Sequence, residues 1–343
     1  MSVFEFEDIV ETLGVDREAL KQRQLPLGAF WHQGSWKIWV PHEVGKYMLL
    51  AGGEPVHFTY LSDAGAASEE DLHFQLLEFA YQKFTRPRTW SFVTSIQDDI
   101  HLLAVQASKL SYFASKQAEI DSSLLASYAR SEIEGLLVTA RSAIDLTYEA
   151  FCSFWTQEVT LLDEAMQSRK LQNKLPKKIS KFLRLDAQEA PHIDGICEKY
   201  VLAPRAVAAI LARRPFLLEL RTARDRIVHG RGDPDLIFAT ERGFAVPAHA
   251  KLCATFNWRP FQRYNEHLFS LKPWVGYVVH ETIATCTDIL MACGAGIELG
   301  PNLFPNHNVF VRDPANPALD DLLQSVSADA SIAQSAAFWC NNP

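Results

Sequence analysis

IEGLLVTARSAIDLTYEAFCSFWTQEVTLL, residues 133–162, places apolar side chains at steps of three and four throughout its length. Ile133, Leu136, Ala140 and Ile144 begin this series. Apolar residues at that spacing line one face of an α-helix. The stretch therefore predicts one long helix with a continuous apolar stripe.

Three further segments show helical signals. The same period begins near Ser95, and a second segment has Pro215 where a first-turn proline belongs and Gly230 where a C-terminal glycine belongs. The last segment runs from Trp274 to Cys293. Four helices with facing apolar stripes predict a mainly α fold built on a four-helix bundle.

The sequence around these helices is different in character. Residues 28–61 are rich in aromatic and β-branched residues, which predicts a small antiparallel sheet, and a helix is expected over 68–84. Residues 237–256 alternate as a β-hairpin does and are expected to form an insertion between the third and fourth helices. One more helix is expected over 318–337.

These patterns predict three regions. They are a small α+β N-terminal domain at 1–93, the helical bundle with its β insertion at 94–298, and an irregular C-terminal extension at 299–343.

Length and composition limit the class of protein. The chain has 343 residues, of which 48% are hydrophobic and 22% charged, enough apolar material for two core-bearing units. The most apolar segment, 274–291, is interrupted by His280, Glu281 and Asp288, so no membrane span is expected. The N-terminus, MSVFEFEDIVE, is acidic where a signal peptide is basic, and a cytoplasmic location is expected.

Cysteine spacing gives no sign of a metal centre. The six cysteines are scattered, without a C-x-x-C pair or histidines at zinc-ligand spacing. We therefore expect no metal and no cofactor.

Positive charge is concentrated in one part of a chain whose net charge is −8. Residues 169–231 contain 15 Lys or Arg against 6 Asp or Glu. Within them, RKLQNKLPKKISKFLR (169–184) carries seven basic groups and no acidic one. Such a cluster is typical of a solvated loop or of a surface that binds a polyanion, because Lys and Arg neutralise the phosphates of RNA and DNA. Lys177, Lys178 and Lys181 are the candidate phosphate contacts in this segment.

The segment RTARDRIVHG, residues 221–230, is the most informative candidate site. At about 100° per residue, Arg221, Arg224, Asp225 and His229 share one flank of the predicted helix. Asp225 lies one turn before His229 and is placed to set its tautomer. The helix dipole favours a protonated ring at His229. These features suit a general acid/base, although a histidine in the last turn is also a common structural device.

Spacing alone does not single out Arg224 and His229, because a spacer of six residues also admits the pair Arg242 and His249. Gly243 and Pro247 argue against a shared helix there.

The stretch RDRIVHG, late in a helical segment, resembles the signature of HEPN (higher eukaryotes and prokaryotes nucleotide-binding) domains. That signature is Arg, a polar residue, usually three more residues, and His, here Arg224, Asp225 and His229. The segments ARSAIDLTYEAF and LPKKISKFL are similar to segments of bacterial members of that superfamily.

This resemblance implies a metal-independent endoribonuclease of the toxin or phage-defence type, with its active site where two bundles meet. His229 would move the proton, Arg224 would bind the phosphate, and Asp225 would orient the ring. Arg221 and Arg226 would hold flanking phosphates. RNA is then the implied substrate, and a homodimer would supply both an acid and a base. An antitoxin or another regulatory partner is also implied.

Two other interpretations remain open. A non-catalytic HEPN-like module would bind a nucleotide, RNA or a protein through the same basic face, with His229 serving only at the helix end. A purely structural scaffold would have no affinity for RNA.

Overall fold

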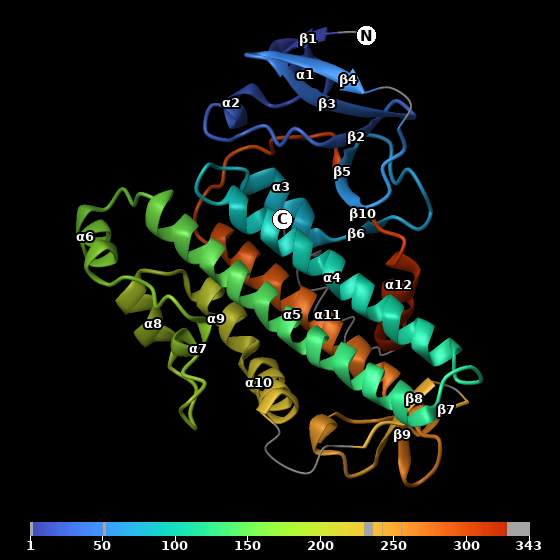
Figure 1. The fold of residues 1–343 in the computed structure, drawn as a ribbon. Helices are drawn as coiled ribbons and strands as arrows, with labels where there is room; N and C mark the ends of the chain where they lie inside the picture. Colours follow the sequence, from blue (N-terminus) through green and yellow to red (C-terminus); the bar gives the residue numbers. More distant parts are fainter. Residues whose placement is uncertain (1–2, 51–52, 230–235, 242, 255, 328–343) are drawn as a thin grey trace. The chain divides into compact units, whose positions relative to one another are not determined.

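A computed structural model describes residues 3–50, 53–229, 236–241, 243–254 and 256–327 (Figure 1). The chain divides into two compact units, each assembled from segments far apart in sequence. Unit 1 comprises Met1–Asp98, Asp145–Ala212 and Thr285–Asn316. Unit 2 comprises Asp99–Ile144, Arg213–Ala284 and Pro317–Pro343. Three long helices contribute residues to both units: α4 (Trp90–Ser115), α5 (Ser122–Gln157) and α11 (Lys272–Met291).

A mixed sheet is the centre of unit 1. Among the described residues it has seven strands in the order β1-β4-β3-β2-β5-β10-β6. Neighbouring strands are antiparallel except for β2 and β5, which run parallel. The strands are β1 (Val3–Glu5), β2 (Ala29–His32), β3 (Ser35–Glu43), β4 (Lys46–Leu50), β5 (Phe58–Ser62), β6 (Leu72–His73) and β10 (Asn308–Arg312).

A two-residue turn joins β2 to β3. Gln33 and Gly34 have φ angles of 51° and 70°, and His32 pairs with Ser35 across the turn. Positive φ at both central positions belongs to the hairpin turn whose twist matches that of the strands it joins. The turn therefore fixes where β2 ends.

The central strands are buried on both faces. Ala29, Tyr60 and Phe310 form a cluster on one face, with Trp31 and Trp36 packed against it. The alternate residues Phe30, Leu61, Val309 and Val311 are also buried, and they point to the opposite face because side chains alternate along a strand. Burial on both faces explains why consecutive residues of β10, such as Val309, Phe310 and Val311, are apolar.

Strand β10 enters the middle of this sheet from far along the chain. It lies between β5 and β6 and is antiparallel to both, with Phe310 opposite Tyr60 and also opposite His73. Helix α3 (Gln75–Lys83) contacts the start of β10, where Val309 N donates to Glu78 Oε2 at 2.6 Å.

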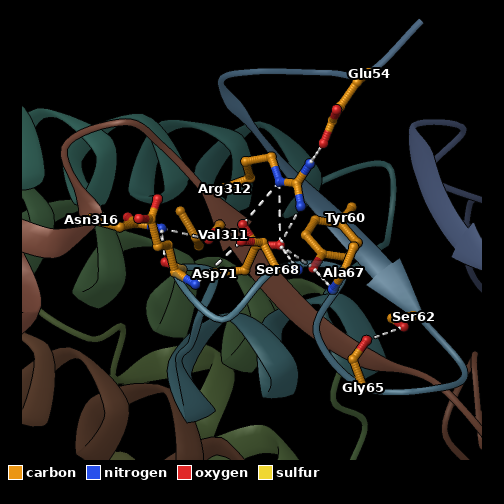
Figure 2. Close-up of polar contacts among 11 residues, drawn as sticks. Glu54, Tyr60, Ser62, Gly65, Ala67, Ser68, Asp71, Val311, Arg312 and Asn316 are labelled. Carbon is orange, nitrogen blue, oxygen red and sulfur yellow. Dashed lines mark hydrogen bonds and ion pairs between the residues drawn. The ribbon is translucent and has the colours of Figure 1, made fainter.

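Arg312, the last residue of β10, carries a charge into the protein interior (Figure 2). Its Nε and Nη2 donate to Asp71 Oδ1 and Oδ2 at 2.9 and 2.8 Å, and Tyr60 donates its hydroxyl to Asp71 Oδ2 at 2.7 Å. Nη1 donates to Glu54 at 2.6 Å, and the guanidinium lies 4.8 Å from the ring centroid of Trp36. The hydrogen bond to Asp71 raises the pKa of Arg312 above its ordinary value. The buried charge is therefore fully paired.

The remaining helices of unit 1 are short. They are α1 (Phe6–Thr12), α2 (Arg17–Leu20), α6 (Glu164–Gln172), α7 (Ile179–Phe182), α8 (Ile193–Tyr200) and α9 (Pro204–Ala212), with a 3₁₀ turn at Ala292–Gly294.

Unit 2 combines helical segments with a small sheet. Between α4 and α5, Gln106 donates to Thr139 at 3.2 Å, and a Cβ at Gly135 would lie 2.9 Å from Gln106 Nε2, so a larger residue there would displace this amide. Gly276 of α11 similarly allows contact with α12, because a Cβ there would lie 2.5 Å from the carbonyl oxygen of Leu322. The other elements are α10 (Arg214–His229), β7 (Phe238–Thr240), β8 (Gly243–Pro247), β9 (Leu268–Ser270), α12 (Asn316–Ser327) and 3₁₀ turns at Lys251–Cys253 and Pro260–Gln262.

The predicted fold class, a mainly α four-helix bundle, is wrong. The structure is about 53% helical but is also built on the seven-stranded sheet and on a second sheet, β7-β8-β9. The error has two physical sources. First, strand β10 is short and lies in a Pro- and Asn-rich stretch. Second, the predicted hairpin at 237–256 is joined by a third strand, β9, which follows it in the sequence.

Helices do occupy the predicted ranges 215–229 and 274–293 to within a few residues. The helix predicted over 318–337 begins as α12, and its second half lies outside the described residues.

The ion pair of β10 gives a stability prediction with an internal control. Asp71→Asn removes the carboxylate from a buried guanidinium, and we expect a loss of about 3–5 kcal/mol in the free energy of unfolding. Glu54→Gln removes the other carboxylate, whose side chain is 72% exposed, and we expect less than about 1 kcal/mol. Urea denaturation followed by circular dichroism measures both. Equal effects of the two substitutions would show that burial of the Asp71 pair does not hold β10.

Candidate functional site

Helix α10 has the polarity that the sequence predicts. Pro215 lies in its first turn, where the missing N–H of proline leaves no intrahelical bond unmade. One face is buried in unit 2 through Phe216, Leu217, Leu220 and Ala223. Because these residues recur every three or four positions, the opposite flank faces solvent.

Contacts with α11 fix the position of that buried face. The ring of Phe216 lies edge-on to Tyr277, with centroids 5.9 Å apart and planes at 87°. Tyr277 donates its hydroxyl to Glu219 Oε2 at 3.2 Å, and burial raises the pKa of Tyr277, so the hydroxyl keeps its proton. The rotation of α10 about its axis is thereby set.

A shielded ion pair anchors the start of α10. Arg213 Nη1 lies 2.8 Å from Glu281 Oε2, and the two side chains are only 13% and 15% exposed. His280 Nδ1 is 3.2 Å from the other oxygen of Glu281. Burial acts to raise the pKa of Glu281, but the hydrogen bond with His280 and the charge of Arg213 outweigh it and hold that pKa below its ordinary value.

The solvent-facing flank of α10 carries three of the predicted site residues together. Arg224 Nη2 donates to Asp225 Oδ1 at 2.8 Å, and Arg221 Nε lies 3.8 Å from Asp225 Oδ2, one turn away. The three side chains are 34–41% exposed. Arg226 is half-buried on the same helix. Two guanidinium groups thus converge on one carboxylate where an anion from solvent can reach them.

The predicted proton-transfer residue is only partly described. The backbone of His229 forms the last residue of α10, and its side chain lies outside the described residues, as does Gly230. The predicted contact between Asp225 and His229 therefore remains a prediction.

The predicted lysines belong to unit 1 and lie around α7. Lys177, Lys178 and Lys181 are all exposed. The apolar residues between them, such as Ile179 and Phe182, are buried and hold this turn in place. The lysines are therefore available to phosphate groups.

One basic residue of the same tract has a structural role instead. Lys170 is 5% exposed, donates to the carbonyl oxygen of Val159 at 2.5 Å and lies 5.2 Å from the ring centroid of Trp155. Nearby, a shallow groove between α6 and α8 is lined by Arg169 and Lys199 and also by Glu198, which lies 3.9 Å from Arg169. Counting charges along the sequence does not distinguish these environments.

Sequence reasoning missed a group of side chains in unit 1. His32, Asp63 and His307 each offer a ligand atom within 4.8 Å of the other two. They are separated by 30 or more residues in sequence, so no spacing motif contains them. The available signal was that each polar residue directly adjoins an apolar, strand-like segment.

Comparisons with protein-family models, with curated proteins and with solved structures found no match. The resemblance to HEPN domains thus depends on the motif and the two similar segments of the sequence alone. None of the described helices has both the length and the apolar character that crossing a membrane requires.

The lowered pKa of Glu281 predicts acid sensitivity. A carboxylate whose folded pKa is depressed stabilises the fold above its ordinary value of 4.5, and this contribution is lost as the pH falls through and below that value. Glu281→Gln should therefore be less stable than the parent at pH 7 and should lose less stability between about pH 5 and pH 3. Thermal unfolding at a series of pH values measures this, with the exposed Glu266→Gln as control. The same acid dependence in both variants would contradict it.

Proposed function

We propose that this chain is a metal-independent endoribonuclease that binds RNA through exposed cationic side chains and cleaves it at the carboxyl-terminal turn of α10. The observation that carries the proposal is the convergence of Arg221 and Arg224 on Asp225 at the exposed flank of this helix. The backbone of His229 follows one turn later.

The chemistry needs three functions that these residue types supply. A ribose 2′-hydroxyl attacks the adjacent phosphate after losing a proton, and the leaving oxygen gains one. His229 moves the proton. Arg224 presents a planar fork of N–H donors to the phosphate oxygens and stabilises the charge that develops on them.

The neighbouring charges have supporting roles. Phosphate competes with Asp225 for Arg221 and Arg224, so RNA binding releases the carboxylate to orient the ring of His229. Arg226 contacts a flanking phosphate. Lys177, Lys178 and Lys181 add affinity for the strand without reading its sequence.

A homodimer completes the proposed active site. Each chain has one Arg224 and one His229, whereas cleavage uses both a base and an acid. A two-fold axis near α10 would bring two copies of each residue to one phosphate. We place this activity in the cytoplasm, where free thiols, as at the five described cysteines, persist. A toxin or phage-defence role, controlled by an antitoxin or another regulatory partner, fits such an activity.

A non-catalytic RNA- or nucleotide-binding module is the second candidate. The 2.8 Å pair between Arg224 and Asp225 favours it, because a carboxylate engaged by arginine is not free to orient an imidazole. In that case Arg224 binds phosphate and His229 only ends the helix.

Cleavage of a fluorescent single-stranded RNA in the presence of EDTA tests the proposal. We expect His229→Ala to reduce the cleavage rate at least about 100-fold while leaving RNA affinity within about two-fold. Arg224→Ala should weaken RNA binding and lower the slope of log affinity against log salt by about one. His249→Ala, an exposed histidine of the same unit, is the matched control.

Undiminished cleavage by His229→Ala would contradict the nuclease. RNA binding without cleavage by the parent chain would establish the binding module instead.

A further inference from the structure

Three strand ends meet at one edge of the unit 1 sheet. Strand β2 ends at His32, Asp63 directly follows β5, and His307 directly precedes β10 (Figure 1). Strands β2 and β5 are parallel with Trp31 opposite Ser62, so their carboxyl ends coincide. Strand β10 is antiparallel to β5 with Asn308 opposite Ser62, so its start lies at the same edge. The topology therefore brings together residues that are far apart in sequence.

The side chains at this edge are close enough to share one ligand. His32 Nδ1 lies 2.7 Å from Asp63 Oδ2, although the two atoms lack the orientation of a hydrogen bond. The rings of His32 and His307 are stacked, with centroids 6.3 Å apart and planes at 14°. One ligand atom from each of the three residues lies within 4.8 Å of the others.

His307 is a buried polar side chain whose ring lacks hydrogen-bond partners among the described residues. It is 5% exposed, and neither ring nitrogen has a hydrogen-bond partner among the described residues. Burying a polar group without a partner is unfavourable, because its hydrogen bonds to water are lost. A neutral imidazole has one ring nitrogen with a free lone pair. A ligand that accepts this lone pair would satisfy one of the two ring nitrogens.

The surroundings hold the three residues in place. Gln82, which is 3% exposed, donates to the carbonyl oxygens of Phe304 and His307 at 2.8 and 3.0 Å. It also accepts from the N–H of Phe304 at 2.8 Å. On the other side, Gln33 N donates to Asp63 Oδ1 at 3.3 Å. These bonds fix the backbone that carries His307 and one carboxylate oxygen of Asp63.

We propose that His32, Asp63 and His307 bind one divalent transition-metal ion at this edge of the sheet. Two imidazoles and one carboxylate are ligands that suit Zn²⁺, Fe²⁺ or Co²⁺, whereas Mg²⁺ and Ca²⁺ prefer oxygen alone. Ligand atoms around a tetrahedral ion lie about 3.3 Å apart, given bonds of about 2.0–2.1 Å. The distances between ligand atoms here range from 2.7 Å, between His32 Nδ1 and Asp63 Oδ2, to at most 4.8 Å, so binding requires changes of about 1.5 Å or less in these distances.

Solvent can reach the proposed metal site, so one ligand position of the metal can hold an exchangeable water. The side chains of His32 and Asp63 are 12% and 22% exposed, so the edge is reached from solvent on their side. Three protein ligands leave a fourth position for water, as in zinc centres that act on substrates. This site is independent of the ribonuclease proposal, whose cleavage is expected to persist in EDTA.

Titration of chelator-stripped protein with Zn²⁺ in a calorimeter tests the site. We expect one Zn²⁺ per chain, with Asp63→Asn and His307→Gln each weakening binding at least about 10-fold. His42→Gln, which replaces an exposed histidine on β3 of the same sheet, should bind as the parent does. Bound Co²⁺ should give visible absorption bands in the parent and lose them in Asp63→Asn.

Circular dichroism establishes that each variant is folded, and His32→Gln replaces any variant that is not. Two results would overturn the proposal. One is the absence of stoichiometric Zn²⁺ binding to the parent, which would leave the three side chains as a proton-sharing cluster. The other is binding that survives these ligand substitutions in folded protein.

Discussion

Burial of the Arg312 charge beside Asp71 constrains how β10 pairs in the sheet of unit 1. The guanidinium must be paired where it is buried, because a charge left unpaired in the interior costs several kcal/mol. Its bidentate bond with Asp71 forms only when β10 lies between β5 and β6 in the observed register. The hydroxyl of Tyr60 and the ring of Trp36 complete the surroundings, so strands β3, β5 and β10 all contribute to one network.

This constraint reaches the other end of the strand. Once Arg312 is fixed, the register places Asn308 opposite Ser62, and His307 must lie beside the ends of β2 and β5. The same strand thus has a paired charge at its carboxyl end and an unpartnered buried imidazole, within the described residues, at its amino end. The charge of Arg312 is satisfied within the sheet, whereas the imidazole of His307 can still bind a ligand. The cationic flank of α10 is set separately, by the packing of Phe216 on Tyr277 in unit 2.

Local signals were enough to predict α10 and a small sheet within 28–61, but not the parallel pairing of β2 with β5 or the place of β10. Pro215 and the spacing of Leu217, Leu220 and Ala223 lie within one helix, so the sequence predicted its range and its exposed flank. Strand β10 has five residues, and its partners lie about 250 positions earlier, so neither its pairing nor the meeting of His32, Asp63 and His307 has a local pattern. Charge counting likewise identified the exposed Lys177, Lys178 and Lys181 but included Lys170, whose ammonium is buried against Val159 and Trp155.

Hydrogen–deuterium exchange of the peptides that contain 304–312 and 58–63 tests most directly whether β10 completes the sheet. The account predicts that the strand amides of both peptides are protected and lose protection at the same urea concentration, because β5 and β10 pair with each other inside one sheet. Rapid exchange across 304–312 while 58–63 stays protected would contradict it, since β10 would then lie outside the sheet and His307 away from His32 and Asp63.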